Sequence, residues 1–149
     1  MDTVQIAEKV ESLIHEKLLA EADDGFSLNG ATLYGVSLGY SGNENPVICH
    51  IATHPDAYDL LEMPTTAVGR MFDCIALLTI GWAAPVNSEG EVEGAPSQHP
   101  EKRRVRLVVC ATRESMASVL RFQDTDETHC DEGTATGFLA EAITKFISV

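Results

Sequence analysis

Hydrophobic residues recur at three- and four-residue steps near both ends of the chain, and this period predicts two amphipathic helices. The first covers residues 3–22, and the second covers residues 136–148. The apolar stripe of the first helix consists of Val4, Ala7, Val10, Ile14 and Leu18, widened by Ile6 and Leu13. Its other face, which we expect in solvent, carries Glu8, Glu11 and Glu16 with Lys9 and Lys17. Asp2 and Gln5 have the spacing of a capping box at the start of this helix.

Between these helices, apolar residues alternate with small or polar ones, which is the period of β-strands. The predicted strands cover residues 32–40, 47–53, 72–82, 104–112 and 116–123. The third is almost continuously apolar from Ile75 to Ile80, which is typical of a central strand covered on both faces. In the first, Gly35 shares a face with Ser37 and Gly39, so another backbone or a helix can approach this face closely.

The connecting segments differ in character. Residues 41–45 have turn composition, so the first two strands are expected to form a hairpin. Residues 56–71 predict one or two short helical turns, interrupted at Pro64. Residues 83–101 form a long connection rich in proline, glycine and glutamate, and connections of this length usually carry function. Residues 124–132 are expected to form an acidic loop.

The resulting element order is α-β-β-(α)-β-β-β-α. It predicts a single α+β domain over residues 1–149, with the N- and C-terminal helices packed on an antiparallel five-stranded sheet. In element order alone, this layout resembles roadblock-type, profilin-type and GAF-type modules. That resemblance implies regulatory, dimerising or ligand-sensing roles as often as catalysis.

Composition adds a strong acidic bias. The chain of 149 residues holds 23 acids and 10 bases, which gives a net charge of −13. Residues 102–106 contain four of the bases and no acid, so the rest of the chain carries −17. A body this acidic repels nucleic acid and anionic membrane surfaces, and neither is expected as a partner.

The expected location is the cytoplasm. The N-terminus shows no secretory signal pattern, and no window is long and apolar enough for a membrane span. The four cysteines, which have no regular spacing, are Cys49, Cys74, Cys110 and Cys130. Three of them lie in apolar, strand-like runs, so we expect reduced, buried thiols.

Two segments contain residue types that bind metals. His50 and His54 are four residues apart, but in an extended strand, at about 3.3 Å per residue, they would be too far apart for one ion. Within residues 124–132, five carboxylates accompany His129 and Cys130. The calcium-loop pattern fails there because its sixth position holds His129 instead of glycine. We therefore expect no metal and no cofactor, with His50 as a single core or pocket histidine.

Three arginines are candidates for binding an anion. Arg104 and Arg106 share one face of their predicted strand, and Arg121 lies in an apolar stripe of the next. Because an isolated buried charge is costly, such an arginine is expected to meet an anion, which its planar guanidinium can bind with two parallel hydrogen bonds. That anion could belong to a ligand, to a partner protein, or to this chain at residues 89–93 or Asp73.

Trp82 is the only tryptophan, and it ends the predicted central strand where the long connection begins. It is expected to line a pocket or anchor a partner, or else to cover the end of the sheet. With Tyr58 and His99, it makes residues 83–101 the preferred location of function. The candidate ligand-binding residues are therefore Arg104, Arg106, Arg121, His50 and Trp82.

The sequence favours a cytoplasmic, non-enzymatic binding or regulatory module that self-associates as a homodimer. No phosphate-binding loop or dinucleotide fingerprint is present, and the expected ligand is a protein or a small anion. The alternative is a small metal-dependent or hydrolase-type enzyme that uses His50 with His54, or His129 with nearby acids. A third hypothesis, mimicry of nucleic acid by the acidic body, fits the charge but not its scattered distribution.

Overall fold

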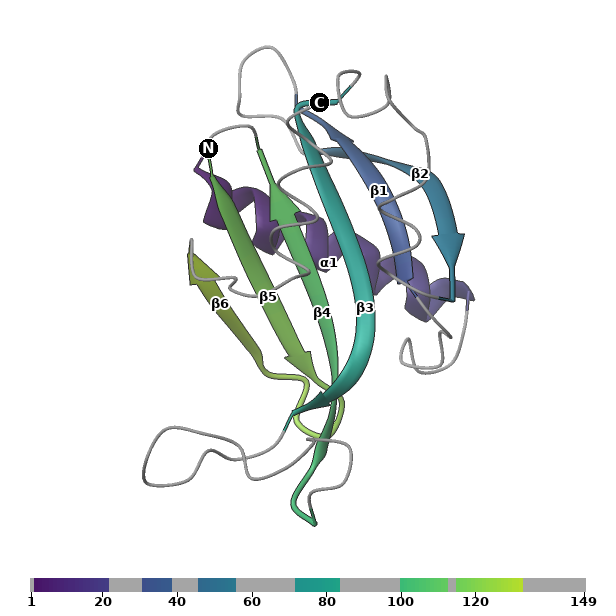
Figure 1. The fold of residues 1–149 in the computed structure, drawn as a ribbon, viewed down its shortest axis with the longest axis vertical. Coiled ribbons are helices and arrows are strands. Elements are labelled where there is room, and N and C mark those ends of the chain that lie inside the picture. The colour runs from purple at the N-terminus through teal and green to yellow at the C-terminus, as the bar shows by residue number, and fades with distance from the viewer. Residues whose placement is uncertain are drawn as a thin grey trace.

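A computed structural model describes residues 2–21, 31–38, 46–55, 72–83, 100–112 and 115–132. These residues form one helix and six strands (Figure 1). The elements are α1 (Thr3–Glu21), β1 (Ala31–Ser37), β2 (Val47–His54), β3 (Cys74–Ala83), β4 (Arg103–Ala111), β5 (Met116–Phe122) and β6 (Thr128–Glu132). The strands form one antiparallel sheet in the order β2-β1-β3-β4-β5-β6. The predicted mixed α+β class is confirmed.

The prediction of a five-stranded sheet is wrong by one strand. Residues 124–132 are not all loop, because β6 pairs with β5 along its whole length, with Val119 opposite Cys130. Pairing of a strand at the sheet edge depends on backbone hydrogen bonds and tolerates charged residues, so hydropathy gives little signal for it. The acidic residues at the start of the segment form the turn between β5 and β6.

Several predictions lie outside the described residues. These are the C-terminal helix at 136–148, the helical turns at 56–71 with Tyr58, and residues 84–99 of the long connection with His99. At the near end of that connection, β3 continues to Ala83.

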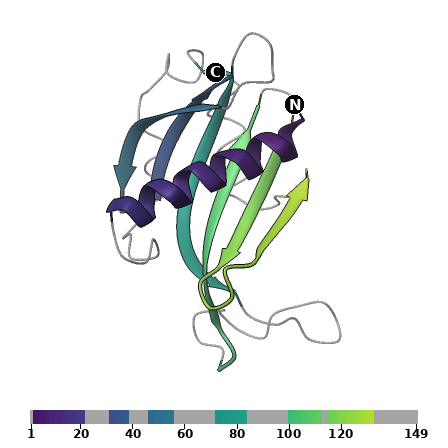
Figure 2. The same cartoon turned by 180° about the vertical axis from the view of Figure 1, so that it is seen from behind.

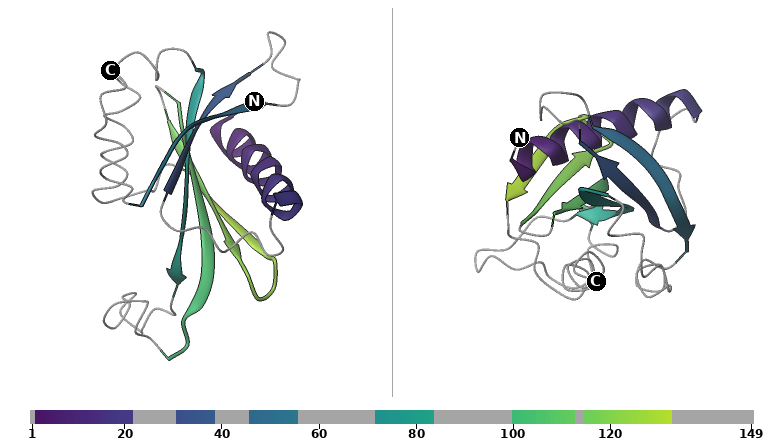
Figure 3. Two further views of the ribbon diagram at one scale, coloured as in Figure 1. Left: turned by 90° about the vertical axis from the view of Figure 1, so that its right-hand side faces the viewer. Right: turned by 90° about the horizontal axis from the view of Figure 1, so that it is seen from above.

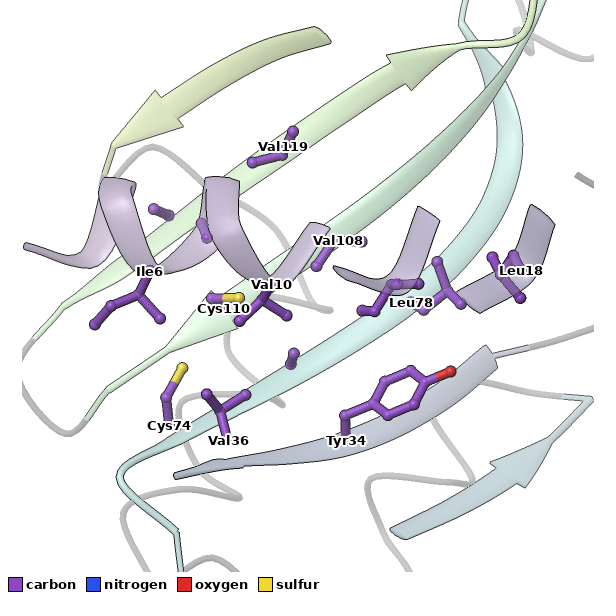
Figure 4. Packing of buried hydrophobic residues seen from close by; sticks show 14 residues of the cluster. Ile6, Val10, Leu18, Tyr34, Val36, Cys74, Leu78, Val108, Cys110 and Val119 are labelled. Atoms are coloured by element: carbon purple, nitrogen blue, oxygen red, sulfur yellow. The ribbon is translucent and has the colours of Figure 1, made fainter. Parts of the chain in front are cut away.

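Helix α1 lies across one face of the sheet (Figure 2). Most of its predicted apolar stripe is buried, with Ala7, Val10 and Ile14 completely inaccessible, whereas Val4 and Leu13 are half-buried. The stripe packs on alternate residues of the central strands, among them Val36, Leu78, Val108 and Val119 (Figure 4). The predicted capping box is confirmed, because Asp2 Oδ1 accepts from Gln5 N at 2.9 Å and Gln5 Oε1 accepts from Asp2 N at 3.0 Å.

The opposite face of the sheet carries a second buried cluster. Its members are Ala31, Leu33, Ile75, Leu77, Val109 and Ala111. Consecutive residues of β3 therefore point into two different apolar environments, which explains why its sequence is apolar at every position from Ile75 to Leu78. The prediction of a central strand is confirmed, since β3 lies between β1 and β4.

The close approach predicted at Gly35 is present, although an aromatic ring rather than a backbone makes it. A Cβ atom added to Gly35 would lie 2.4 Å from two ring atoms of Phe72. At Gly81 in β3, by contrast, an added Cβ would meet no atom within 4 Å. A side chain at position 35 would clash with Phe72, whereas a side chain at position 81 would not, so Gly81 is a suitable control for substitution of Gly35.

We predict that Gly35→Ala destabilises the protein by about 1–3 kcal/mol, because the ring of Phe72 must shift within a packed sheet face. Gly81→Ala should be neutral or stabilising by up to about 1 kcal/mol, since alanine restricts the unfolded chain. Urea denaturation measures both. Equal losses of stability in the two variants would contradict the assigned contact.

Candidate functional site

Three charged side chains lie buried between α1 and the sheet. Glu11 of α1, Arg106 of β4 and Arg121 of β5 have exposed fractions of 1%, 0% and 9%. Arg106 and Arg121 are directly opposite in the β4–β5 register, so their like charges require an anion between them. Glu11 provides it: its Oε1 accepts from Arg106 Nη2 at 3.2 Å and from Arg121 Nε at 2.6 Å. Its Oε2 accepts from Arg121 Nη2 at 2.9 Å.

Two further groups extend this ion network to the surface, namely the partly buried His15 of α1 and the exposed Asp126 of the β5–β6 connection. Asp126 Oδ1 accepts from Arg121 Nη1 at 2.8 Å and lies 3.6 Å from His15 Nε2. His15 Nδ1 lies 2.5 Å from Arg106 Nη2. Because a guanidinium only donates, Nδ1 must accept, which makes the imidazole neutral with its proton on Nε2. Two carboxylates and two guanidiniums then balance in charge.

The pKa shifts follow from these contacts. Burial alone would raise the pKa of Glu11, but the hydrogen bonds and positive charges of Arg121 and Arg106 outweigh it and lower the pKa. The hydrogen bond from Arg121 likewise lowers the pKa of Asp126. The hydrogen bond to Glu11 raises the pKa of Arg121. The carboxylates and Arg121 are therefore held in their charged forms at neutral pH.

The network answers a question that the sequence left open. Arg106 and Arg121 meet an internal carboxylate, but it belongs to Glu11, which was expected on the solvent face of the helix. That expectation was wrong because Glu11 occupies a step of the buried stripe, four residues after Ala7 and three before Ile14. The alternative partner Asp73 accepts instead from the backbone N of Leu38 at 2.8 Å. Residues 89–93 lie outside the described part of the chain.

A second cluster of candidate residues lies where β3 and β4 extend past α1 (Figure 3). Trp82 of β3 is directly opposite Arg104 of β4. The guanidinium carbon of Arg104 lies 4.9 Å from the centre of the Trp82 ring system, and Lys102 Nζ lies 4.7 Å from it. Trp82 keeps 38% of its surface exposed. We call Trp82, Lys102 and Arg104 the cationic tip.

The neighbouring Arg103 shows how alternation along β4 separates these charges. Arg103 points to the face of the sheet opposite α1, where it packs over Phe122. Its guanidinium carbon lies 4.0 Å from the centre of the Phe122 ring. Its Nε and Nη2 donate to the two carboxylate oxygens of Asp124 at 2.8 and 2.7 Å. This hydrogen bonding raises the pKa of Arg103 and lowers that of Asp124. Arg103 is thus neutralised locally, on the side away from the cationic tip.

His50 lies apart from the other candidates, on strand β2 at the sheet edge, and it is exposed, so the expectation of a core histidine is wrong. Its ring contacts Tyr34 edge-on, with 6.0 Å between ring centres, and its Nε2 lies 2.8 Å from Thr53 Oγ1. A β-bulge explains the second contact, because Tyr34 pairs with His50 whereas Leu33 pairs with Ala52. The extra residue brings His50 and Thr53 onto one face, although they are three apart.

The same bulge separates His50 from His54. His50 pairs with Tyr34, which faces α1, and His54 pairs with Ala31, which faces the opposite cluster. The prediction that residues 47–53 are extended is confirmed by β2. Two imidazoles on opposite faces of one strand cannot bind a shared ion.

The acidic segment has internal partners as well. Asp124 and Asp126 bind Arg103 and Arg121, and His129 packs edge-on against Phe122 with 5.3 Å between ring centres. Within the described ranges, no three His, Cys, Asp or Glu residues come together as a metal site. The cysteines are free; Cys74 and Cys110 are buried as expected, whereas Cys49 is exposed.

Of the five predicted ligand-binding residues, the structure brings four into two adjacent rows on the α1 side of the sheet. Arg106 and Arg121 form the row beneath α1, and Trp82 and Arg104 belong to the next row. Comparison of the chain with known protein families, curated proteins and solved structures finds no match. The described part of the chain contains no helix with the length and apolarity needed to cross a membrane.

We predict a loss of stability below about pH 6.5 that depends on His15. Burial, and then the charges of Arg121 and Arg106, lower the pKa of His15 from its ordinary 6.5, so the unfolded chain takes up this proton first as the pH falls. Stability from His15 is therefore complete above pH 6.5 and is lost below it. Glu11 and Asp126 contribute in a lower window, because their pKa values are lowered from 4.5 and 3.8.

The measurement is urea denaturation of wild type and His15→Gln between about pH 7 and pH 5. Glutamine can still accept from Arg106 but does not titrate, so the variant should lose less stability over this interval. Parallel pH profiles of the two proteins would contradict the assigned state of His15.

Proposed function

We propose that this chain is a non-enzymatic binding module that recognises an anionic ligand at the cationic tip. The observation that carries the proposal is the packing of Arg104 against the exposed ring system of Trp82. A guanidinium that packs on an aromatic ring through its face keeps its N–H donors in the guanidinium plane, directed away from the ring. Those donors match the oxygens of a carboxylate or a phosphate.

The partners of the other arginines support this assignment. Arg103, Arg106 and Arg121 each bind a carboxylate of this chain. Arg104 binds no carboxylate among the residues that the structure describes.

The location and shape of the tip also fit recognition. Trp82 and Arg104 lie on the projecting ends of β3 and β4, beyond the helix that covers the middle of the sheet (Figure 3). Tryptophan and arginine are the residue types that most often dominate binding energy at interfaces. A cytoplasmic location is part of the proposal, supported by the free cysteines.

A thermal-shift screen tests the proposed function. Carboxylates and phosphates, each paired with a neutral analogue at equal ionic strength, are added to wild type, Arg104→Ala and Arg103→Ala. A ligand of the folded state raises the melting temperature by mass action, so at least one anion should stabilise wild type and Arg103→Ala but not Arg104→Ala. Equal responses of wild type and Arg104→Ala to every anion would refute recognition at the tip.

The homodimer that the sequence analysis expects is a separate part of the proposal. Light scattering after size-exclusion chromatography should give twice the single-chain mass of 16.1 kDa at micromolar concentration. A species of 16.1 kDa under these conditions would remove the dimer and leave the cationic tip as the binding site.

A further inference from the structure

The electrostatic surroundings of the cationic tip restrict the ligands it can take. Residues 102–106 carry four positive charges, whereas the rest of the chain carries −17. An anionic ligand is therefore attracted by these residues at short range and repelled by the rest of the chain at long range. The local attraction is limited because Arg103 and Arg106 bind Asp124 and Glu11, whereas Arg104 packs against Trp82. The repulsion, by contrast, grows with every charge that the ligand carries.

The two effects scale differently with ligand charge. The first oxyanion group meets Arg104 at hydrogen-bond distance, where a charged hydrogen bond is strongest. Further charges on the same ligand lie farther from Arg104, and they add to the repulsion by the net negative charge of the chain, which is screened over about 8 Å at physiological salt. Added charge therefore brings little further attraction at the tip.

The geometry also favours one kind of head group. The contact with Trp82 limits the freedom of the Arg104 side chain, so less of it is lost when a ligand binds. A restricted planar fork selects a group that presents two oxygens side by side, as carboxylates and phosphomonoesters do. A spherical halide does not offer two acceptor atoms in the spacing of the fork.

We infer that the cationic tip binds a small carboxylate or phosphomonoester of low charge through Arg104 and does not favour polyanions. This inference rests on the proposed function and names its ligand class. It places nucleic acids, polyphosphate and acidic peptide tracts outside the ligands that the site prefers.

The fluorescence of Trp82 reports on the tip directly, because it is the only tryptophan of the chain. Acetate, methyl phosphate, tripolyphosphate and a ten-residue glutamate peptide are titrated at constant ionic strength, with sodium chloride as the control. Acetate and methyl phosphate distinguish the two head groups. A saturable change with at least one of them is expected, and tripolyphosphate and the peptide should bind no more tightly.

Three variants locate the binding event. Arg104→Ala should abolish the fluorescence response, and Arg104→Lys should weaken binding by roughly tenfold, since it keeps the charge but loses the fork. Arg103→Ala removes the same charge from the other face of the sheet and should bind as wild type does. Circular dichroism and urea denaturation establish that each variant is folded, and Arg104→Lys serves as the test if Arg104→Ala is not.

The outcomes separate the inference from the proposed function. Tenfold tighter binding of tripolyphosphate or the peptide, lost in Arg104→Ala, would overturn the low-charge ligand class and leave an anion site at the tip. A response that persists unchanged in both Arg104 variants, or no response to any of the four probes beyond sodium chloride, would overturn both.

Discussion

The carboxylate of Glu11 between Arg106 and Arg121 is the constraint on which the rest of the structure depends. Removing two guanidiniums and a carboxylate from water is costly, and only mutual pairing with good hydrogen bonds compensates for that cost. Here the carboxylate binds one arginine through both of its oxygens and the second through Oε1. Loss of Glu11 would leave two like charges buried side by side on adjacent strands.

This constraint also fixes how α1 lies on the sheet. Alanine, valine and isoleucine side chains could pack on strands β1, β3, β4 and β5 in several neighbouring positions of the helix. The carboxylate, however, meets both guanidiniums in only one of them, and His15 and Asp126 add contacts that require the same position. We infer that the network specifies the register of α1, whereas the apolar stripe provides most of the burial.

The position of α1 in turn separates the arginines of β4 by environment. Arg106 lies under the helix and is neutralised there, and Arg103 points to the other face and binds Asp124. Arg104 faces the α1 side one row farther along the strand, where Trp82 is opposite it and in contact with it. Three arginines within four residues of sequence therefore have three different surroundings.

Sequence periodicity predicted the parts of this fold that depend on local patterns. The stripe of α1, the capping box of Asp2 and Gln5, and the doubly buried β3 all follow from the spacing of residue types. Other features depend on contacts between distant segments, and local patterns do not contain them. Glu11 was assigned to solvent because it is charged, and β6 was missed because backbone pairing at an edge has a weak hydropathy signal.

In the candidate site, too, the sequence predicted how side chains alternate along β4 but not the contacts that they make there. The shared face of Arg104 and Arg106 followed from alternation, but their separation into a half-buried and a buried environment depends on where α1 crosses the sheet. The opposite facing of His50 and His54 depends on a bulge that becomes visible only when β2 is paired with β1.

A double-mutant cycle between Glu11 and Arg121 tests the central claim most directly. The free energy of unfolding is measured in urea for wild type, Glu11→Gln, Arg121→Gln and the double variant. Each single variant leaves a buried charge short of its partner and should cost about 3–5 kcal/mol, whereas the double variant should cost less than the sum by about 1–3 kcal/mol. Costs that add to within about 0.5 kcal/mol would show that the two residues act independently, and would contradict the account.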